Sequence, residues 1–113
     1  MDRVGRVAQL REGAEAEYER WHAAVWPEVL QTIREAGIRN YSIFRHGRWL
    51  FSYFELTDDA DLDEMGRKWM QQPACRKWEE IMQTLQEPQP GSGQSIWWMP
   101  MKEVWHLEEH CRR

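Results

Sequence analysis

The sequence has little of what marks secreted, membrane or nucleic-acid-binding proteins. Its 113 residues include only two cysteines, Cys75 and Cys111, with no Cys-x-x-Cys pair, so we expect neither a zinc knuckle nor a redox dithiol. No apolar run approaches the roughly 20 residues that cross a membrane. The charged N-terminal stretch lacks the apolar core of a secretory signal. With a net charge of −4, the chain lacks the excess of basic residues that is typical of nucleic-acid-binding proteins. These absences indicate a soluble protein of the reducing cytoplasm.

Clusters of residues for metal or covalent chemistry are also missing. Four histidines are present, but only His106 and His110 share an element at ligand spacing, and they lie near the C-terminus. We therefore expect no metal site. No Gly-x-Ser-x-Gly turn marks a nucleophile, and no pair of carboxylates stands out from the many acidic residues. If the protein is an enzyme, we expect it to transfer protons without a cofactor.

Tryptophan, by contrast, is abundant, with eight copies in 113 residues. Aromatic side chains at this density are typical of a thick core, of an interface, or of a pocket that stacks on flat ligand faces. The length allows one domain. We assign residues 1–108 to it and expect residues 109–113 to form a disordered tail.

The hydrophobic pattern predicts strands and helices in an order known from α+β proteins. Pro27 should break the first helix, and Gly37 should end the second. The expected strands span residues 4–10, 40–44, 49–56 and 101–107. The expected helices span 14–25, 27–36, a segment from 58 to an interruption at 72–73, and 74–85, with a loop over 87–95. This βαββαβ order predicts a ferredoxin-like fold, an antiparallel sheet with helices on one face.

The second face of that sheet needs a cover of its own. On the strand over 49–56, Trp49, Phe51 and Tyr53 point to one face, while Leu50 and Phe54 point to the other. Both faces are therefore apolar, and the helices cover one of them. A second copy of the same sheet is the simplest cover for the other face, so we expect a homodimer.

Three helical residues are candidates for chemistry. Tyr18 and His22 are four residues apart and share one helix face, where a histidine could donate and accept protons near neutral pH. On spacing alone, a core histidine bonded to a backbone carbonyl is the commoner arrangement. Trp78 lies in a helical stripe with Ile81 and Met82, which favours a core position, although an indole could also stack on a sugar ring.

Tyr41 is a fourth candidate, because it lies near the start of a predicted strand. Its hydroxyl could bond a ligand, or it could be an edge tyrosine with a hydrated tip.

Five segments, in order along the chain, carry unusual residues together. They are EYERWHAAVWPEV over 17–29, GIRNYSI over 37–43, LFSYFE over 50–55, CRKW over 75–78 and KEVWHL over 102–107. The first resembles the Tyr-x-x-x-His-x-x-x-Trp-Pro-Glu segment of the L-rhamnose mutarotase family, and the others resemble that family's later strands and its Cys-x-x-Trp-Trp helix start. The resemblance spans roughly residues 3–108.

The resemblance implies a cofactor-free sugar mutarotase that interconverts the α and β anomers of a deoxyhexose. It also implies a dimeric α/β barrel built on the ferredoxin-like fold. By the same resemblance, His22 is the proton donor, and Tyr18, Tyr41, Trp78 and Glu79 contact the monosaccharide.

Glu79 stands where the family has a second tryptophan. If it lines the pocket, we expect altered selectivity among deoxyhexoses of the rhamnose or fucose type. Glu79 could instead face solvent, since it is one step off the stripe of Trp78, Ile81 and Met82. Two other functional classes remain open: a dimeric ferredoxin-like oxygenase or haem-degrading protein, and a non-catalytic sugar-binding module.

Overall fold

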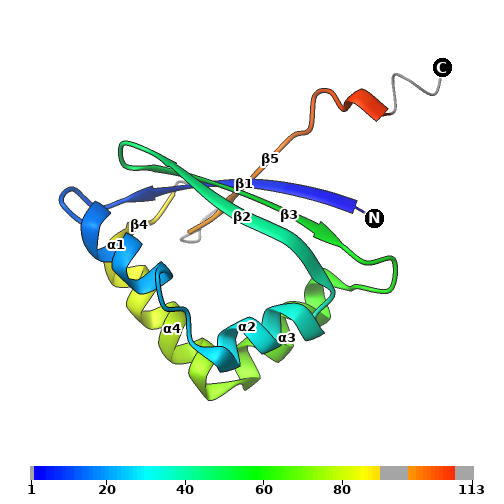
Figure 1. Ribbon diagram of the computed structural model, residues 1–113, viewed down its shortest axis with the longest axis horizontal. Helices are drawn as coiled ribbons and strands as arrows, with labels where there is room; N and C mark the ends of the chain where they lie inside the picture. Colours follow the sequence, from blue (N-terminus) through cyan, green and yellow to red (C-terminus); the bar gives the residue numbers. More distant parts are fainter. Residues whose placement is uncertain (1, 90–96, 109–113) are drawn as a thin grey trace.

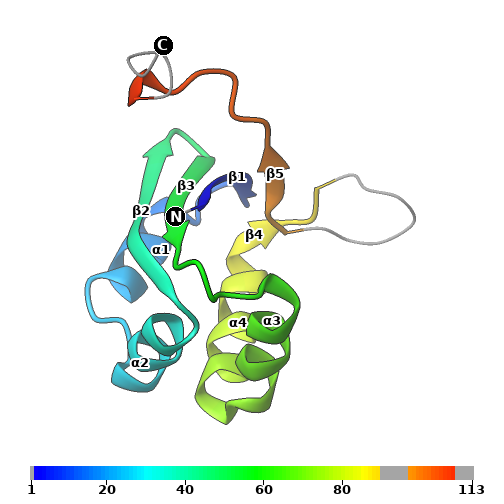
Figure 2. The same cartoon turned by 90° about the vertical axis from the view of Figure 1, so that its right-hand side faces the viewer.

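The computed structural model describes residues 2–89 and 97–108, which form an antiparallel sheet with helices α1–α4 on one of its faces (Figures 1 and 2). The elements are β1 (Asp2–Leu10), α1 (Glu15–His22), α2 (Pro27–Glu35), β2 (Ile38–His46), β3 (Trp49–Leu56), α3 (Leu62–Gln71), α4 (Pro73–Leu85), β4 (Gln86–Glu87) and β5 (Met99–Met101). The strand order is β2-β3-β1-β4, with β5 also paired to β1. The predicted α+β architecture with one covered face is therefore confirmed. Cys111, the tail over 109–113 and most of the predicted loop over 87–95 lie outside the described residues.

The first predicted helix ends earlier than its apolar stripe suggested. The stripe ran to Val25, but α1 stops at His22. Trp26 is extended, with φ −62° and ψ 140°, because the residue before a proline avoids the helical region. Pro27 then occupies the first turn of α2, where its missing N–H costs no hydrogen bond. Gly37, with φ +86°, follows the last turn of α2, as predicted.

The two C-terminal helices begin where the sequence predicts a start and an interruption. The Asp61 side chain accepts hydrogen bonds from the backbone N–H groups of Asp63 and Glu64 and so caps α3. Gln72 is extended, with φ −82° and ψ 115°, and Pro73 opens α4. The resulting break lets α3 and α4 run in different directions beneath the sheet (Figure 1).

The prediction of a closing strand over 101–107 is wrong. The edge beside β1 is instead occupied by two short strands, because Gln86 and Glu87 pair with Leu10 and Gln9, and residues 99–101 pair with residues 5–7. Beyond Met101 the chain leaves the sheet. Val104 is 86% exposed there and Trp105 58%, so burial of a strand face does not hold this segment in the ladder.

A β-bulge in β2 decides which side chains face the helices. The ladder with β3 pairs Arg39 with Glu55 and Ser42 with Tyr53, so Asn40 and Tyr41 together oppose a single residue. Asn40 has φ 51°, a left-handed conformation that asparagine tolerates better than most residues. In a regular strand, residues 38 and 41 would lie on opposite faces. The extra residue brings Ile38, Tyr41 and Ile43 to the same, inner face.

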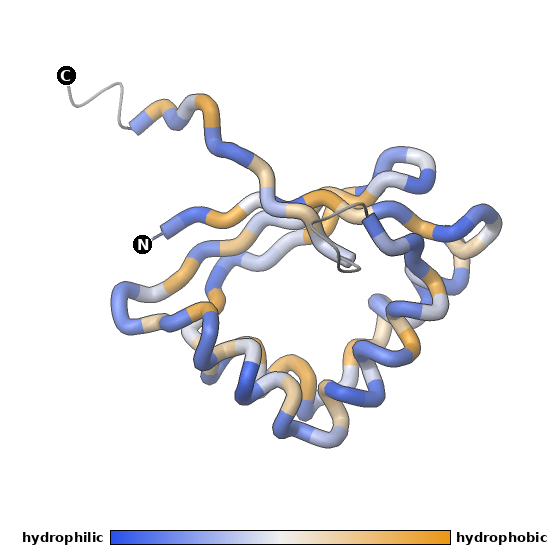
Figure 3. The backbone as a smooth tube through the Cα atoms, turned by 180° about the vertical axis from the view of Figure 1, so that it is seen from behind, coloured by the Kyte–Doolittle hydropathy of each residue, from blue (hydrophilic) through white to orange (hydrophobic). Residues whose placement is uncertain are grey.

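Two groups of buried side chains pack between the sheet and the helices. The larger is centred on Leu10, Leu50, Val29 and Cys75 and the smaller on Phe54. Hydrophobic and hydrophilic residues alternate along the helices, as expected for helices that bury one side (Figure 3). No helix in the described ranges is long and apolar enough to span a membrane.

Candidate active site

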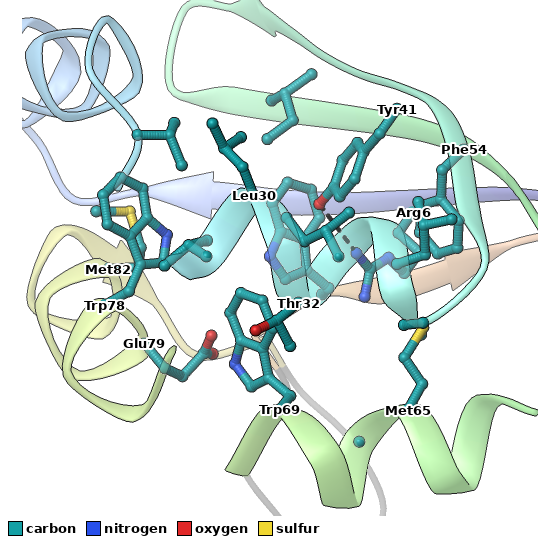
Figure 4. Close-up of a pocket in the computed structure, with 18 of the residues that line it drawn as sticks. Arg6, Leu30, Thr32, Tyr41, Phe54, Met65, Trp69, Trp78, Glu79 and Met82 are labelled. Atoms are coloured by element: carbon teal, nitrogen blue, oxygen red, sulfur yellow. Dashed lines mark hydrogen bonds between the residues drawn. The ribbon is translucent and has the colours of Figure 1, made fainter. Parts of the chain in front are cut away.

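A cavity of about 850 Å³ lies between the inner face of the sheet and the four helices. Its wall is mostly apolar, with a few polar groups directed inward (Figure 4). All five residues expected at the site lie on this wall: Tyr18, His22, Tyr41, Trp78 and Glu79. They come from α1, β2 and α4, so the fold brings together segments that are far apart in the sequence. A pocket of this kind is the usual place to look for a small-molecule site.

Tyr18 and His22 form a fixed pair within α1. Their rings stack with centroids 4.2 Å apart and an interplanar angle of 28°. Nδ1 of His22 lies 2.9 Å from the backbone oxygen of Tyr18. A carbonyl only accepts hydrogen bonds, so Nδ1 carries the proton and donates it. Nε2 is then the ring nitrogen left for acid–base chemistry. His22 therefore bonds a backbone carbonyl and also lines the cavity.

Burial sets the protonation of this pair. Burial lowers the pKa of His22 below its ordinary value of 6.5, and the hydrogen bond to the Tyr18 carbonyl opposes that shift in part. Burial also raises the pKa of the Tyr18 hydroxyl far above its ordinary value, and the nearby Tyr41 and Glu79 add to this effect. At neutral pH the Tyr18 phenol therefore stays protonated, so it can donate a hydrogen bond but cannot act as a base.

Trp78 is both a core residue and a cavity residue. It is 5% exposed, and its ring meets His22 edge-on at 5.4 Å and Trp26 at 5.3 Å. Tyr18 covers another part of the same imidazole. The histidine ring is thus held by two aromatic neighbours and one hydrogen bond, which fixes its orientation in the cavity.

The bulge in β2 directs Tyr41 to an arginine that the sequence analysis missed. Nη2 of Arg6 donates to the Tyr41 hydroxyl at 3.3 Å, the contact shown as a dashed line in Figure 4. Burial raises the pKa of Tyr41, although Arg6 opposes the shift. Arg6 could have been found from its alternation in β1, where Ala8 and Leu10 on the same face are fully buried.

Glu79 lies on the cavity wall (Figure 4). The expectation that it could face solvent is wrong, because one step off the helical stripe still points it toward the cavity. Its carboxylate accepts a long hydrogen bond of 3.5 Å from Nε2 of Gln83. That weak contact leaves acceptor capacity for a ligand hydroxyl.

Sequence comparison identifies related proteins over nearly the whole chain. The model of a family described as L-rhamnose mutarotase matches residues 3–107. An L-rhamnose mutarotase of Opitutus terrae is 34% identical over 110 residues, which cover 96% of this chain and 100% of that protein. An L-fucose mutarotase of Xanthomonas campestris pv. campestris is 33% identical, with 96% of this chain and 90% of that protein covered.

Comparison with solved structures agrees on the fold. The crystal structure of an L-rhamnose mutarotase from Formosa agariphila superimposes with a TM-score of 0.72 at 22% identity, over 94% of this chain and 98% of that one. Tetracenomycin F2 cyclase from Streptomyces glaucescens gives a TM-score of 0.64 at 19% identity, with the same two coverages. At these identities the likeness concerns the fold alone.

Proposed function

The chain belongs to the L-rhamnose mutarotase family, and we propose that it interconverts the α and β anomers of a deoxyhexose such as L-rhamnose without a cofactor. Membership makes it an isomerase and favours this activity over an oxygenase, a haem-degrading protein or a non-catalytic sugar-binding module. The relatives named above act on L-rhamnose and on L-fucose, two sugars that share a 6-methyl group and differ in ring stereochemistry.

His22 is the proposed proton donor. The imidazolium form of His22, which is the minor form at neutral pH because burial lowers its pKa, gives its Nε2 proton to the ring oxygen as the bond between that oxygen and C1 breaks. A water molecule held by Tyr18 takes the proton of the anomeric hydroxyl. The open aldehyde rotates about its C1–C2 bond, and the ring recloses on the other face. The observation that supports this role is the bond from Nδ1 to the Tyr18 carbonyl, which commits one ring nitrogen and leaves Nε2 for the sugar. General acid catalysis of this kind typically contributes about 10²–10⁴-fold.

The remaining wall residues are proposed to bind the sugar. The Tyr18 phenol, which stays protonated, donates a hydrogen bond from α1 to a sugar oxygen. The Tyr41 hydroxyl donates one from β2, on the sheet side of the cavity. The indole of Trp78 offers an apolar surface for the carbon face of the ring. Glu79 accepts a hydrogen bond from a hydroxyl, where a second indole would offer only an apolar surface.

Magnetisation-transfer NMR on free sugars tests the activity directly. In the presence of the protein, exchange between the two anomeric protons of L-rhamnose should be much faster than in buffer. His22→Ala should remove this acceleration, whereas His46→Ala should keep it, because His46 is an exposed residue at the end of β2 and outside the cavity. Full exchange by a folded His22→Ala protein would contradict the proposed role.

A homodimer is proposed to cover the outer face of the sheet. Cross-strand pairing places Phe44, Phe51, Val7 and Met99 in one row across β2, β3, β1 and β5. Phe44 is 65% exposed and Phe51 37%. Packing two such faces together would give the dimeric α/β barrel expected from the sequence, and a stable interface should bury at least about 1,000 Å².

Sedimentation velocity at micromolar concentration tests the dimer. The wild-type protein should sediment at twice the 13.7 kDa chain mass. Phe51→Glu should give monomers, whereas Gln71→Glu, which adds the same charge on the exposed side of α3, should not. A wild-type protein that stays monomeric would contradict the proposal. The cytoplasmic location expected from the sequence stays a prediction.

A further inference from the structure

Arg6 is a cation on the wall of a largely apolar cavity. Its guanidinium carbon lies 4.9 Å from the centre of the Phe54 ring and 5.2 Å from that of Trp98. Among residues 2–89 and 97–108, no carboxylate forms an ion pair with it. Its one hydrogen bond to another described side chain is the bond to Tyr41, and its Nε is buried without a partner. Leaving a charged donor unsatisfied is costly, so this side chain is suited to a ligand that completes its bonds.

The chemistry of the guanidinium points to the missing ligand group. The guanidinium lies over the rings of Phe54 and Trp98, and its N–H groups are the part that can hydrogen-bond a ligand. These N–H groups form a planar fork that matches a carboxylate with two parallel hydrogen bonds, and a charged pair of this kind is stronger than a bond to a neutral hydroxyl. A carboxylate would also neutralise the cation in a region where the surrounding side chains are apolar.

We propose that Arg6 binds a carboxylate of the substrate, so that the cavity takes hexuronic acids as well as deoxyhexoses. This inference rests on the proposed mutarotase function and names a substrate class for the same site. Ring opening at C1 is unchanged by a carboxylate at C6, because the same ring oxygen and the same anomeric hydroxyl exchange protons.

The positions of the charges in the cavity fix how such a sugar would lie. Glu79 and Arg6 occupy different sides of the cavity, with Trp69 between them in the view of Figure 4. Glu79 would repel a carboxylate placed near it, while Arg6 attracts one to the side of Tyr41. Arg6 also acts electrostatically on Tyr18, whose ring stacks on His22. A single sugar ring would therefore place C6 near Arg6 and its anomeric carbon toward His22.

Two matched sugar series separate the effect of the C6 group from that of the ring. L-fucose, L-galactose and L-galacturonate share one ring stereochemistry and differ only at C6, as do L-rhamnose, L-mannose and L-mannuronate. Binding is measured by saturation-transfer difference NMR and turnover by anomer exchange, so affinity is read separately from catalysis. The variants are Arg6→Met, which keeps the aliphatic stem, and Arg6→Lys, which keeps the charge. The control is Arg45→Met, because Arg45 pairs with Glu19 outside the cavity.

In at least one series, the wild-type protein should bind the hexuronate more tightly than the 6-methyl sugar and should accelerate its anomer exchange. Arg6→Met should weaken hexuronate binding by roughly 10- to 100-fold, the range for hydrogen bonds to charged groups. Its effect on the 6-methyl sugars should be several times smaller, and Arg6→Lys should fall between Arg6→Met and the wild type. Added salt should weaken only the hexuronate complex.

Other outcomes overturn one claim or the other. Rapid exchange of L-rhamnose or L-fucose with no preference for either hexuronate would refute the carboxylate site and leave the mutarotase function intact. An equal loss for all three C6 groups in Arg6→Met would show that Arg6 only supports Tyr41. Tight, Arg6-dependent binding of hexuronates without accelerated exchange of any sugar would refute the mutarotase function, and with it the claim that hexuronates are substrates.

Discussion

Replacement of Asn40 by glycine, alanine and valine measures what the bulge in β2 requires of its central residue. Asn40 has φ 51°, and its side-chain amide donates a hydrogen bond to Glu55, which also accepts a bond of 2.7 Å from the Tyr53 hydroxyl. All three replacements lose the bond to Glu55. The differences among them therefore report on the left-handed backbone conformation.

The expected order of stability is glycine, then alanine, then valine. A left-handed conformation costs an ordinary L-residue about 1–2 kcal/mol, which glycine avoids. Glycine loses more conformational entropy on folding, and this offsets about 0.4–1 kcal/mol of that advantage. Asn40→Gly should thus be more stable than Asn40→Ala by about 0.5–1 kcal/mol, or about 2–6 °C in melting temperature for a domain of this size. Valine should be the least stable, because a branched Cβ makes this conformation a genuine outlier.

Thermal and urea unfolding of the three variants check this order, and anomer exchange of L-rhamnose reports on Tyr41 in the same samples. Asn40→Gly should keep most of the exchange activity, whereas Asn40→Val should lose more of it, since a shifted bulge misplaces the neighbouring Tyr41. The reasoning would be refuted if alanine proved as stable as glycine, or if valine left both stability and exchange unchanged.

Further predictions concern the cavity and the turn after α2. Tyr18→Phe should slow anomer exchange less than His22→Ala does, because it removes a hydrogen-bond donor and no acid; equal losses would contradict this. Glu79→Trp should change the relative exchange rates of L-rhamnose, L-fucose and their 6-hydroxy counterparts, since a site that bonds a hydroxyl strongly rejects analogues lacking it; unchanged ratios would show that Glu79 plays no part in selectivity. Burial lowers the pKa of His22 in the folded protein, so below pH 6.5 the unfolded chain binds a proton at His22 more readily than the folded chain does. The free energy of unfolding should therefore fall as the pH drops from 6.5 toward the pKa of the folded state. Urea unfolding at pH 7.5 and 5.5 should show a smaller difference in His22→Gln. Gly37→Ala should destabilise the protein in thermal melts, because Gly37 has φ +86° and a Cβ there would collide with Thr57; an unchanged melting temperature would contradict this.

The spacing of apolar residues and the positions of proline and glycine predicted most helices and strands of the fold. Pro27, Gly37 and Pro73 lie at helix boundaries as expected, and β3 spans the predicted residues 49–56. These features depend on local chemistry, so they can be found from neighbouring residues. The split edge strand could not be found in this way, because it depends on which segments reach β1, and Gln86–Glu87 is too short a strand to give a pattern.

The site was predictable where its residues share one helix. Tyr18 and His22 are four residues apart in α1, and the structure places both on the cavity wall. Arg6 was missed because a charge in a strand is ordinarily taken for a solvent-facing position. Alternation in β1 places it on the inner face with the buried Ala8 and Leu10. Tyr41 was found as a candidate, but the bulge that turns it inward shows only in the ladder.

The hydrogen bond from Nδ1 of His22 to the Tyr18 carbonyl has a consequence for how the proposed enzyme resets after each turnover. With Nδ1 committed, the proton that leaves Nε2 on ring opening returns to Nε2 when the C5 hydroxyl closes the ring again. Forward and reverse reactions thus use one atom, as microscopic reversibility requires. The imidazole ends each cycle in the protonation state in which it began, without a relay to bulk solvent. For this step, turnover at fixed pH should therefore be insensitive to the concentration of buffer.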